Sequence, residues 1–172
     1  MPSASGPPGT PPLAAPYTVS FRADDLRDLR HAVADWAARA GLQGQRAVDF
    51  VIAVHEIATN AIRHGSPVAH LALQITGTAA QAEVGDSGHW PLEPPTDPAP
   101  AELGMGLYVA RRVCDQVTIR RGATGSTVIA QMSLPGTTPP ARGDLTRGDK
   151  YTIQASTSRR GRRRSGNKPP MT

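Results

Sequence analysis

The chain has 172 residues, a formal net charge of +5 at pH 7 and a single cysteine, Cys114. This length suits one ordinary domain, and no segment approaches the roughly 18 consecutive apolar residues of a membrane span. The first residues also lack the basic start and apolar run of a signal peptide. A lone cysteine offers neither an intrachain disulfide nor a metal site by itself. We therefore expect a cytoplasmic protein without membrane association.

The positive charge is concentrated at the C-terminal end. Residues 136–172 hold nine Lys and Arg residues against two Asp, a net charge of +7, so the preceding residues carry −2. The arginine cluster GRRRSG has no interleaved aromatic side chains that would stack on bases. We interpret the charge as a property of a solvated tail, and we expect at most nonspecific attraction to nucleic acids.

Composition divides the chain into three parts. Residues 1–15 and 136–172 are rich in Pro, Gly, Ser and Thr and contain few side chains that could form a core. Such segments cannot offset their ordering entropy by apolar burial. We expect both ends to be disordered and a single domain to span residues 16–135.

Hydrophobic periodicity and turn residues predict the elements of this domain. In chain order we expect a strand at 17–21, helices at about 24–40 and 45–64, strands at 71–75 and 82–86, a helix at about 106–115, and strands at 117–121 and 127–134. The proline-rich segment 88–104 shows no periodicity. Helices and mostly antiparallel strands in this order predict an α+β two-layer sandwich, in which helices cover one face of a mixed, mostly antiparallel sheet.

The second predicted helix is apolar over most of its circumference, so we expect it to be largely buried. One narrow polar stripe interrupts this surface and carries Asp49, Glu56, Asn60 and Arg63. Glu56 and Asn60 lie one turn apart and face the same way. A carboxylate can accept a proton and an amide oxygen can bind Mg²⁺, so the stripe is either the wall of a cleft or simply the solvent-exposed side of the helix.

Two glycine-containing segments follow. In VGDSGHW, Asp86 could accept a hydrogen bond from an exocyclic amine, and Gly88 would let a flat ring approach the backbone. In LGMGLYVARR, two glycines precede a helix, whose free amides can bind phosphate. Each segment taken alone is more simply explained as an ordinary turn or loop. The chain lacks a Walker-type Gly-Lys-Ser/Thr sequence and the third glycine of a dinucleotide fold, which disfavours both of those classes.

Taken in order, these segments resemble the conserved boxes of the GHKL (Bergerat-fold) ATP-binding proteins. HEIATNAIRHG resembles the N box, DSG the first glycine box, GMGL the second, and GSTV the last strand of the adenine pocket. The resemblance covers residues 17–134. Within this class, the short chain and the Glu-Ile-Ala-Thr-Asn sequence are similar to the anti-sigma-factor serine kinases, of HATPase type.

The resemblance implies a role for each matching residue, with ATP and Mg²⁺ as cofactors. Asp86 would bind the adenine amine, Gly88 would flank the ring, and Thr127 would support the adenine through its hydroxyl or a water. On the phosphate side, Asn60 would be the metal ligand. The phosphates would also face three residues of the second glycine box, namely Gly104, Gly106 and Leu107.

Glu56 would be the catalytic general base. A serine hydroxyl must lose a proton during attack, whereas the imidazole that histidine kinases phosphorylate is already a nucleophile, so Glu56 disfavours a histidine kinase. The resemblance thus implies an ATP-dependent serine/threonine protein kinase, a transferase of transcription regulation. Its partners would be a sigma factor and an anti-anti-sigma (STAS-domain) protein, and a homodimer stays open.

Two departures from the family pattern favour an alternative. His89 and Trp90 follow the first glycine box where a small residue is usual, and Met105 stands between the glycines where a basic residue is common. These changes would reshape the adenine pocket and remove a phosphate contact. The alternative is a non-catalytic ATP-binding module that only sequesters its partner. The third hypothesis is a histidine-kinase-type ATPase domain. It is disfavoured because such kinases need a helical hairpin that carries the phosphorylated histidine, and only one helix is predicted before the N box.

Overall fold

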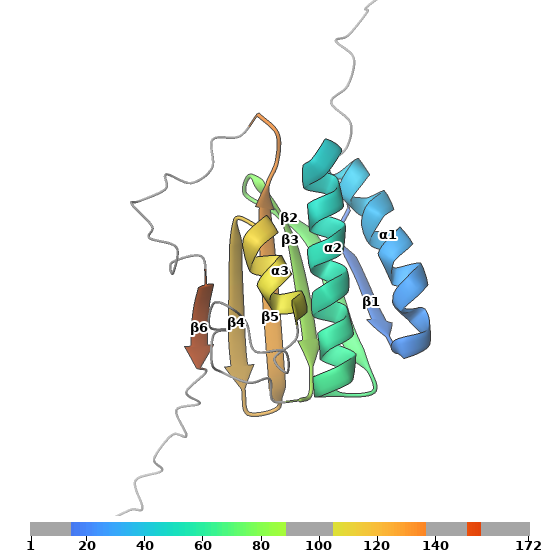
Figure 1. The fold of residues 1–172 in the computed structure, drawn as a ribbon, viewed down its shortest axis with the longest axis vertical. Helices are drawn as coiled ribbons and strands as arrows, with labels where there is room; N and C mark the ends of the chain where they lie inside the picture. The colour runs from blue at the N-terminus through green and yellow to red at the C-terminus, as the bar shows by residue number, and fades with distance from the viewer. Residues whose placement is uncertain (1–14, 89–104, 137–150, 156–172) are drawn as a thin grey trace, which may run out of the picture.

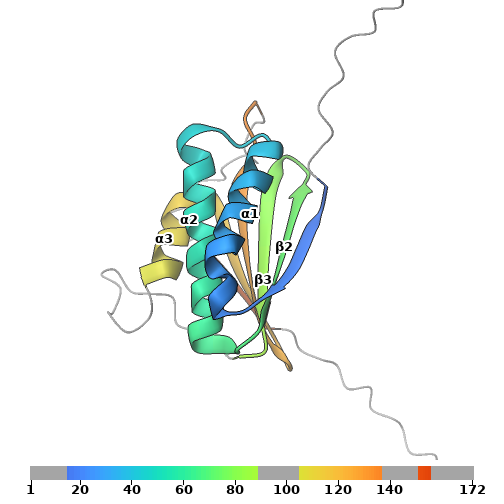
Figure 2. The same ribbon diagram turned by 90° about the vertical axis from the view of Figure 1, so that its right-hand side faces the viewer.

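A computed structural model describes residues 15–88, 105–136 and 151–155. The described residues form one six-stranded sheet with the strand order β1-β2-β3-β5-β4-β6. Helices α1, α2 and α3 all lie on the same face of this sheet (Figure 1), and the view from the side shows the two layers (Figure 2). The predicted α+β two-layer sandwich is therefore confirmed.

The elements follow the predicted order closely. They are β1 (Tyr17–Phe21), a short 3-10 turn (Ala23–Asp25), α1 (Leu26–Arg39), α2 (Gly44–Asn60), a π-helical turn (Ala61–Gly65), β2 (Ala69–Thr76), β3 (Ala79–Asp86), α3 (Met105–Val113), β4 (Gln116–Gly122), β5 (Gly125–Ser133) and β6 (Tyr151–Ala155). The predicted helix at 45–64 thus ends its regular part at Asn60 and continues as a π-helical turn. Such turns occur frequently at functional sites.

The core lies between the sheet and the helices. Buried side chains alternate along the strands, as Leu71 and Leu73 do on β2, because successive residues of a strand point to opposite faces. Trp36 of α1 and Phe50 of α2 are both buried and stack with ring centroids 6.2 Å apart. None of the helices in the described ranges has the length and hydropathy needed to cross a membrane.

Helix α2 is less completely buried than the sequence predicts. Its core side includes the buried residues Phe50, Val54, Ile57 and, in the π-helical turn, Ala61, and Ala53 and Ala58 are buried as well. The opposite side faces outward, and Val48 is 50% exposed there. The helix contacts the sheet and its neighbours α1 and α3, and none of the other helices and strands in the described residues covers its outer side (Figure 2).

Strand β6 lies within the segment 136–172, where we expect disorder, and this part of the prediction is wrong for residues 151–155. The strand pairs in parallel with the outer edge of β4, from Val117 opposite Tyr151 to Arg121 opposite Ala155. A five-residue strand in a polar segment depends on this distant partner for its hydrogen bonds, so local sequence gives little sign of it. The other predicted disordered residues, at 1–14, 137–150 and 156–172, lie outside the described residues.

Candidate functional site

The polar residues of α2 meet the first turn of α3. Gly106 is buried there, and a β-carbon added to it would lie 2.6 Å from Oε2 of Glu56 and 3.0 Å from Nδ2 of Asn60. Only glycine leaves room for this approach, since real β-carbons do not come so close to other heavy atoms. The Glu56 and Asn60 part of the polar stripe is therefore covered by the start of α3, whereas Arg63 is exposed, so the stripe is not merely solvent-exposed along its whole length.

Glu56 and Asn60 differ in burial. Asn60 is only 6% exposed and Glu56 is half-buried, although they lie on neighbouring turns of the same helix. Leu107 follows Gly106 and is 8% exposed within the core, which anchors the first turn of α3. Amides at a helix start are free to bind anions, and the amide oxygen of Asn60 is a suitable Mg²⁺ ligand. These residues fit a magnesium-bound phosphate group.

Asp86 ends β3 at the same end of the sheet and is 8% exposed. Its Oδ1 accepts a hydrogen bond of 2.7 Å from the amide of Gly88. Gly65 lies directly against the Asp86 carboxylate, Gly88 against the Gly65 backbone, and Gly125 against the Asp86 carbonyl, and a β-carbon on any of these glycines would clash. Three close backbone approaches thus hold Asp86 in place and leave no side chain beside its carboxylate at these positions.

The predicted adenine contact Thr127 lies on the other face of the sheet. The register of β3 and β5 pairs Thr127 with Gly85 and Ser126 with Asp86. Directly paired residues of antiparallel strands point to the same face, so Ser126 shares the helix-covered face with Asp86 and Thr127 does not. Ser126 is 2% exposed, and its Oγ donates a 3.0 Å hydrogen bond to the Gly88 carbonyl. Ser126 therefore replaces Thr127 as the hydroxyl residue of this site.

The sequence does not single out Ser126 because GATGS looks like one long turn. In the structure the turn contains only Ala123 and Thr124, and β5 begins at Gly125. Two hydroxyl residues then follow each other on a strand, and alternation allows only one to face the helices. A prediction that paired β5 with Asp86 in register would have selected Ser126.

The structure thus groups the predicted residues in two clusters. Glu56 and Asn60 meet Gly106, next to Leu107, where α2 contacts α3, and Asp86, Gly88 and Ser126 lie together at the end of β3. Gly65, in the turn that follows α2, touches Asp86. Gly104, His89 and Trp90 lie outside the described residues. Met105 begins α3.

An ion pair fixes the opposite end of α2. Nη2 of Arg46 lies 2.6 Å from Oδ2 of Asp115, which also accepts a 2.7 Å hydrogen bond from the amide of Ser133. Burial raises the pKa of Asp115, but the hydrogen bonds from Ser133 and Arg46 outweigh it, so the pKa lies below its usual value. The pair joins the start of α2 to the segment after α3 and to the end of β5, so it ties this end of the helix layer to the sheet.

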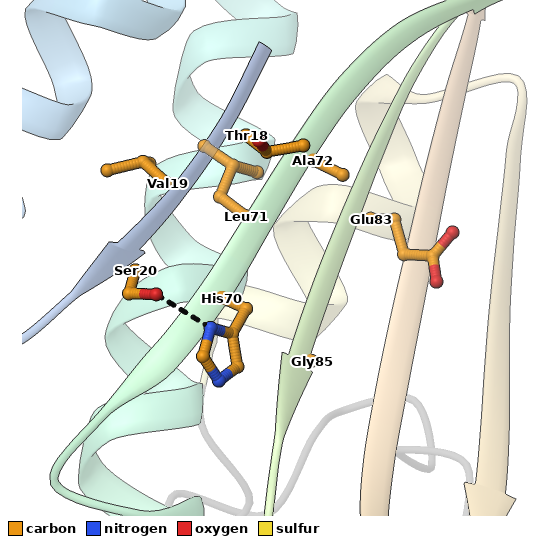
Figure 3. A pocket seen from close by; sticks show the side chains of 8 residues that line it. All are labelled: Thr18, Val19, Ser20, His70, Leu71, Ala72, Glu83 and Gly85. Atoms are coloured by element: carbon orange, nitrogen blue, oxygen red, sulfur yellow. Dashed lines mark hydrogen bonds between the residues drawn. The ribbon is translucent and has the colours of Figure 1, made fainter. Parts of the chain in front are cut away.

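The uncovered face of the sheet has a hollow of its own, formed by β1, β2 and β3 (Figure 3). Ser20 Oγ and His70 Nδ1 form a 2.9 Å hydrogen bond across it, and Glu83 also lines it. None of the predicted site residues lines this hollow. Glu56, Asn60 and Asp86 lie on the helix-covered side of the sheet, away from this hollow.

Comparison with known proteins agrees with this arrangement. Residues 19–132 match the family model of the histidine kinase-like ATPase domain, so the chain belongs to the histidine kinase-like ATPase family. The predicted GHKL class is thereby confirmed, and with it an ATP-binding type of domain. A search of curated proteins found no match.

Solved structures similar to this one include the following two. The crystal structure of the RsbU and RsbW domains of Rv1364c from Mycobacterium tuberculosis has a TM-score of 0.56 and 25% identity, over 74% of this chain and 34% of that chain. The histidine kinase domain of the blue-light activated histidine kinase EL346 from Erythrobacter litoralis has a TM-score of 0.42 and 19% identity, over 63% and 59% of the two chains. The chain spans about a third of the length of the first of these proteins.

Proposed function

We propose that this protein is an ATP-dependent serine/threonine protein kinase that phosphorylates a serine of a STAS-domain anti-anti-sigma partner and sequesters a sigma factor. The observation that carries the proposal is the close packing of Gly106 against Glu56 and Asn60. In this arrangement a carboxylate and a side-chain amide that would bind magnesium lie beside the amides of a helix start, to which phosphates would bind. The similarity to a structure with an RsbW domain supports the partner-switching part.

In this proposal each residue has one task. Asp86 and Ser126, held by the Gly88 backbone, would bind the adenine end, and Asn60 would hold the metal at the phosphate end. Bound magnesium would neutralise charge on the phosphates during transfer. Glu56 would take the proton from the attacking serine hydroxyl as the new oxygen–phosphorus bond forms and the bond from the γ-phosphorus to ADP breaks.

The test separates binding from transfer. Glu56→Gln removes the base but keeps its size, so we expect ATP affinity within about threefold of the wild type and a loss of transfer of at least about a hundredfold. Asp49→Asn is the matched control, because Asp49 occupies the same stripe two turns earlier and hydrogen-bonds Gln45. Calorimetry measures binding, and labelled ATP with a STAS partner measures transfer. Equal transfer by the Glu56 variant and the wild type would exclude the assigned base.

The second candidate is the sequestering module, which the Met105 substitution in the second glycine box favours. Here ATP would stabilise the partner-binding surface without reacting. This candidate predicts that the wild type binds ATP and a sigma factor but transfers no label to any STAS protein. It also predicts that Glu56→Gln leaves sigma-factor binding unchanged. In a kinase, the same variant would no longer phosphorylate the STAS partner and so would no longer release it in the phosphorylated form.

A further inference from the structure

A third polar residue lies in the same cross-strand row as Asp86 and Ser126. The register pairs Asp86 of β3 with Ser126 of β5, and Ser126 with Arg121 of β4. Paired residues of antiparallel strands share a face, so the Arg121 side chain lies on the helix-covered face in line with the other two. Its neighbour Arg120 pairs with Thr127 and points to the opposite face.

The Arg121 side chain has an unusual environment. Its Nε is buried and has no hydrogen-bond partner among the described residues, and the residue as a whole is half-buried. A buried donor without an acceptor costs free energy, so folding alone gives no reason for an arginine here. A hollow of about 440 Å³ at this end of the sheet is lined from both faces, by Asp86, Ser126 and Arg121 of the row and by His70, Gly85, Arg120 and Thr127 from the other face. The hollow therefore shows open space beside the row, and the cross-strand register is what separates Arg121 from Arg120.

We propose that Arg121 is a nucleotide-contacting residue, whose guanidinium donates hydrogen bonds to an acceptor of the bound nucleotide. The proposal rests on the proposed ATP site and adds a contact that none of the family motifs in the sequence contains. Asp86 would supply an acceptor at one end of the row and Arg121 a cationic donor at the other. A guanidinium is suited to this task because it keeps its charge when partly buried and binds phosphate or ring acceptors in a planar fork.

The neighbouring arginine provides a matched control. Arg121→Ala and Arg120→Ala remove the same charge from adjacent positions, but from opposite faces of β4. Calorimetric titration of the full chain with Mg²⁺ and ATP should show affinity reduced about tenfold or more by Arg121→Ala and changed less than twofold by Arg120→Ala. Arg121→Met keeps the aliphatic stem and should show the same reduction in affinity. It takes the place of Arg121→Ala if the alanine variant folds poorly.

Titration with ADP, AMP and adenosine identifies the acceptor. A reduction that disappears when phosphates are removed assigns a phosphate, and one that persists with adenosine assigns the base or ribose. Unfolding of the nucleotide-free protein provides a second readout. Because Nε has no partner in the protein, the Arg121 variants should unfold at a temperature equal to or above that of the wild type.

Three results would overturn the inference. Wild-type ATP affinity in the Arg121 variants would show that the side chain makes no contact. Equal loss of ATP affinity in Arg121→Ala and Arg120→Ala would show that only the overall positive charge matters and that Arg121 makes no specific contact. Reduced thermal stability with unchanged affinity would make Arg121 structural. If the wild type itself fails to bind ATP, the proposed function fails, which is a different result from loss of binding in Arg121→Ala alone.

Discussion

Gly106 of α3 lies in direct contact with Glu56 of α2, and a β-carbon at position 106 would stand 2.6 Å from the Glu56 carboxylate and 2.9 Å from its β-carbon. The contact joins the two parts of the site that come from separate motifs. It also means that the position of the carboxylate depends on the absence of a side chain fifty residues further along the chain, so changes in α3 act directly on α2.

Gly106→Ala should therefore damage both the site and the fold. The added methyl group must displace either Glu56 or the first turn of α3, and overpacking of this kind costs about 1–3 kcal/mol. We expect urea unfolding to show that loss and calorimetry to show ATP affinity reduced at least about tenfold. Gly85→Ala is the control, because a β-carbon at position 85 would come no closer than 3.6 Å to any neighbouring atom, the nearest being Oγ1 of Thr127. Similar behaviour of both variants would contradict the proposed role of the contact.

Asp86→Asn tests the adenine end of the site. The substitution keeps the shape and one acceptor for the Gly88 amide, but it replaces the second oxygen with an NH₂ group that would face the adenine amine. We expect ATP affinity to fall at least about tenfold while the unfolding free energy changes by about 1 kcal/mol or less. Glu83→Gln, on the other face of β3, should bind ATP normally. Unchanged affinity in the Asp86 variant would remove this residue from the site.

The register of β5 predicts opposite results for two adjacent hydroxyl residues. Ser126→Ala leaves the Gly88 carbonyl without its donor, so we expect a loss of about 1 kcal/mol in stability together with weaker ATP binding. Thr127→Ala, on the uncovered face, should leave ATP affinity unchanged. Titration of both variants under identical conditions checks this. A larger effect from the Thr127 variant would show that the pairing with Gly85 is wrong.

The ion pair between Arg46 and Asp115 predicts a pH dependence of stability. Because the pKa of Asp115 is lower in the folded protein than its usual 3.8, its contribution is present above that value and is lost as the pH falls through the lower folded-state pKa. The pair is partly exposed, with side-chain exposures of 42% and 31%, so we expect about 1 kcal/mol or less. Asp115→Asn should be less stable than the wild type at pH 7.

The difference between the wild type and Asp115→Asn should shrink as the pH falls below 3.8, which urea unfolding at a series of pH values would measure. The exposed Asp28 of α1 provides a control, because Asp28→Asn should change stability little at any of these pH values. A difference for the Asp115 variant that stays constant down to the lowest pH would show that the carboxylate charge contributes nothing.

The sequence predicts most of the domain because its strands alternate and its helices are amphipathic. β1 is placed correctly, and the face of α2 with Phe50 is buried as expected. The faces of short strands are harder to predict. Thr127 and Ser126 are equally plausible from the sequence, and only the register with Asp86 selects one. Arg121 was not singled out, since its place in the row depends on a strand order in which β5 separates β3 from β4.

The parallel pairing of β6 with β4 has a consequence for synthesis of the chain. The five antiparallel strands are complete once Ser133 has been made, whereas β6 begins only at Tyr151. During that interval the outer edge of β4 has unpaired backbone groups, and a free edge of this kind can pair with another chain. During synthesis the domain would thus pass through an aggregation-prone intermediate with an exposed strand edge. Pairing of β6 with β4 would cover that edge only after the later segment has been translated.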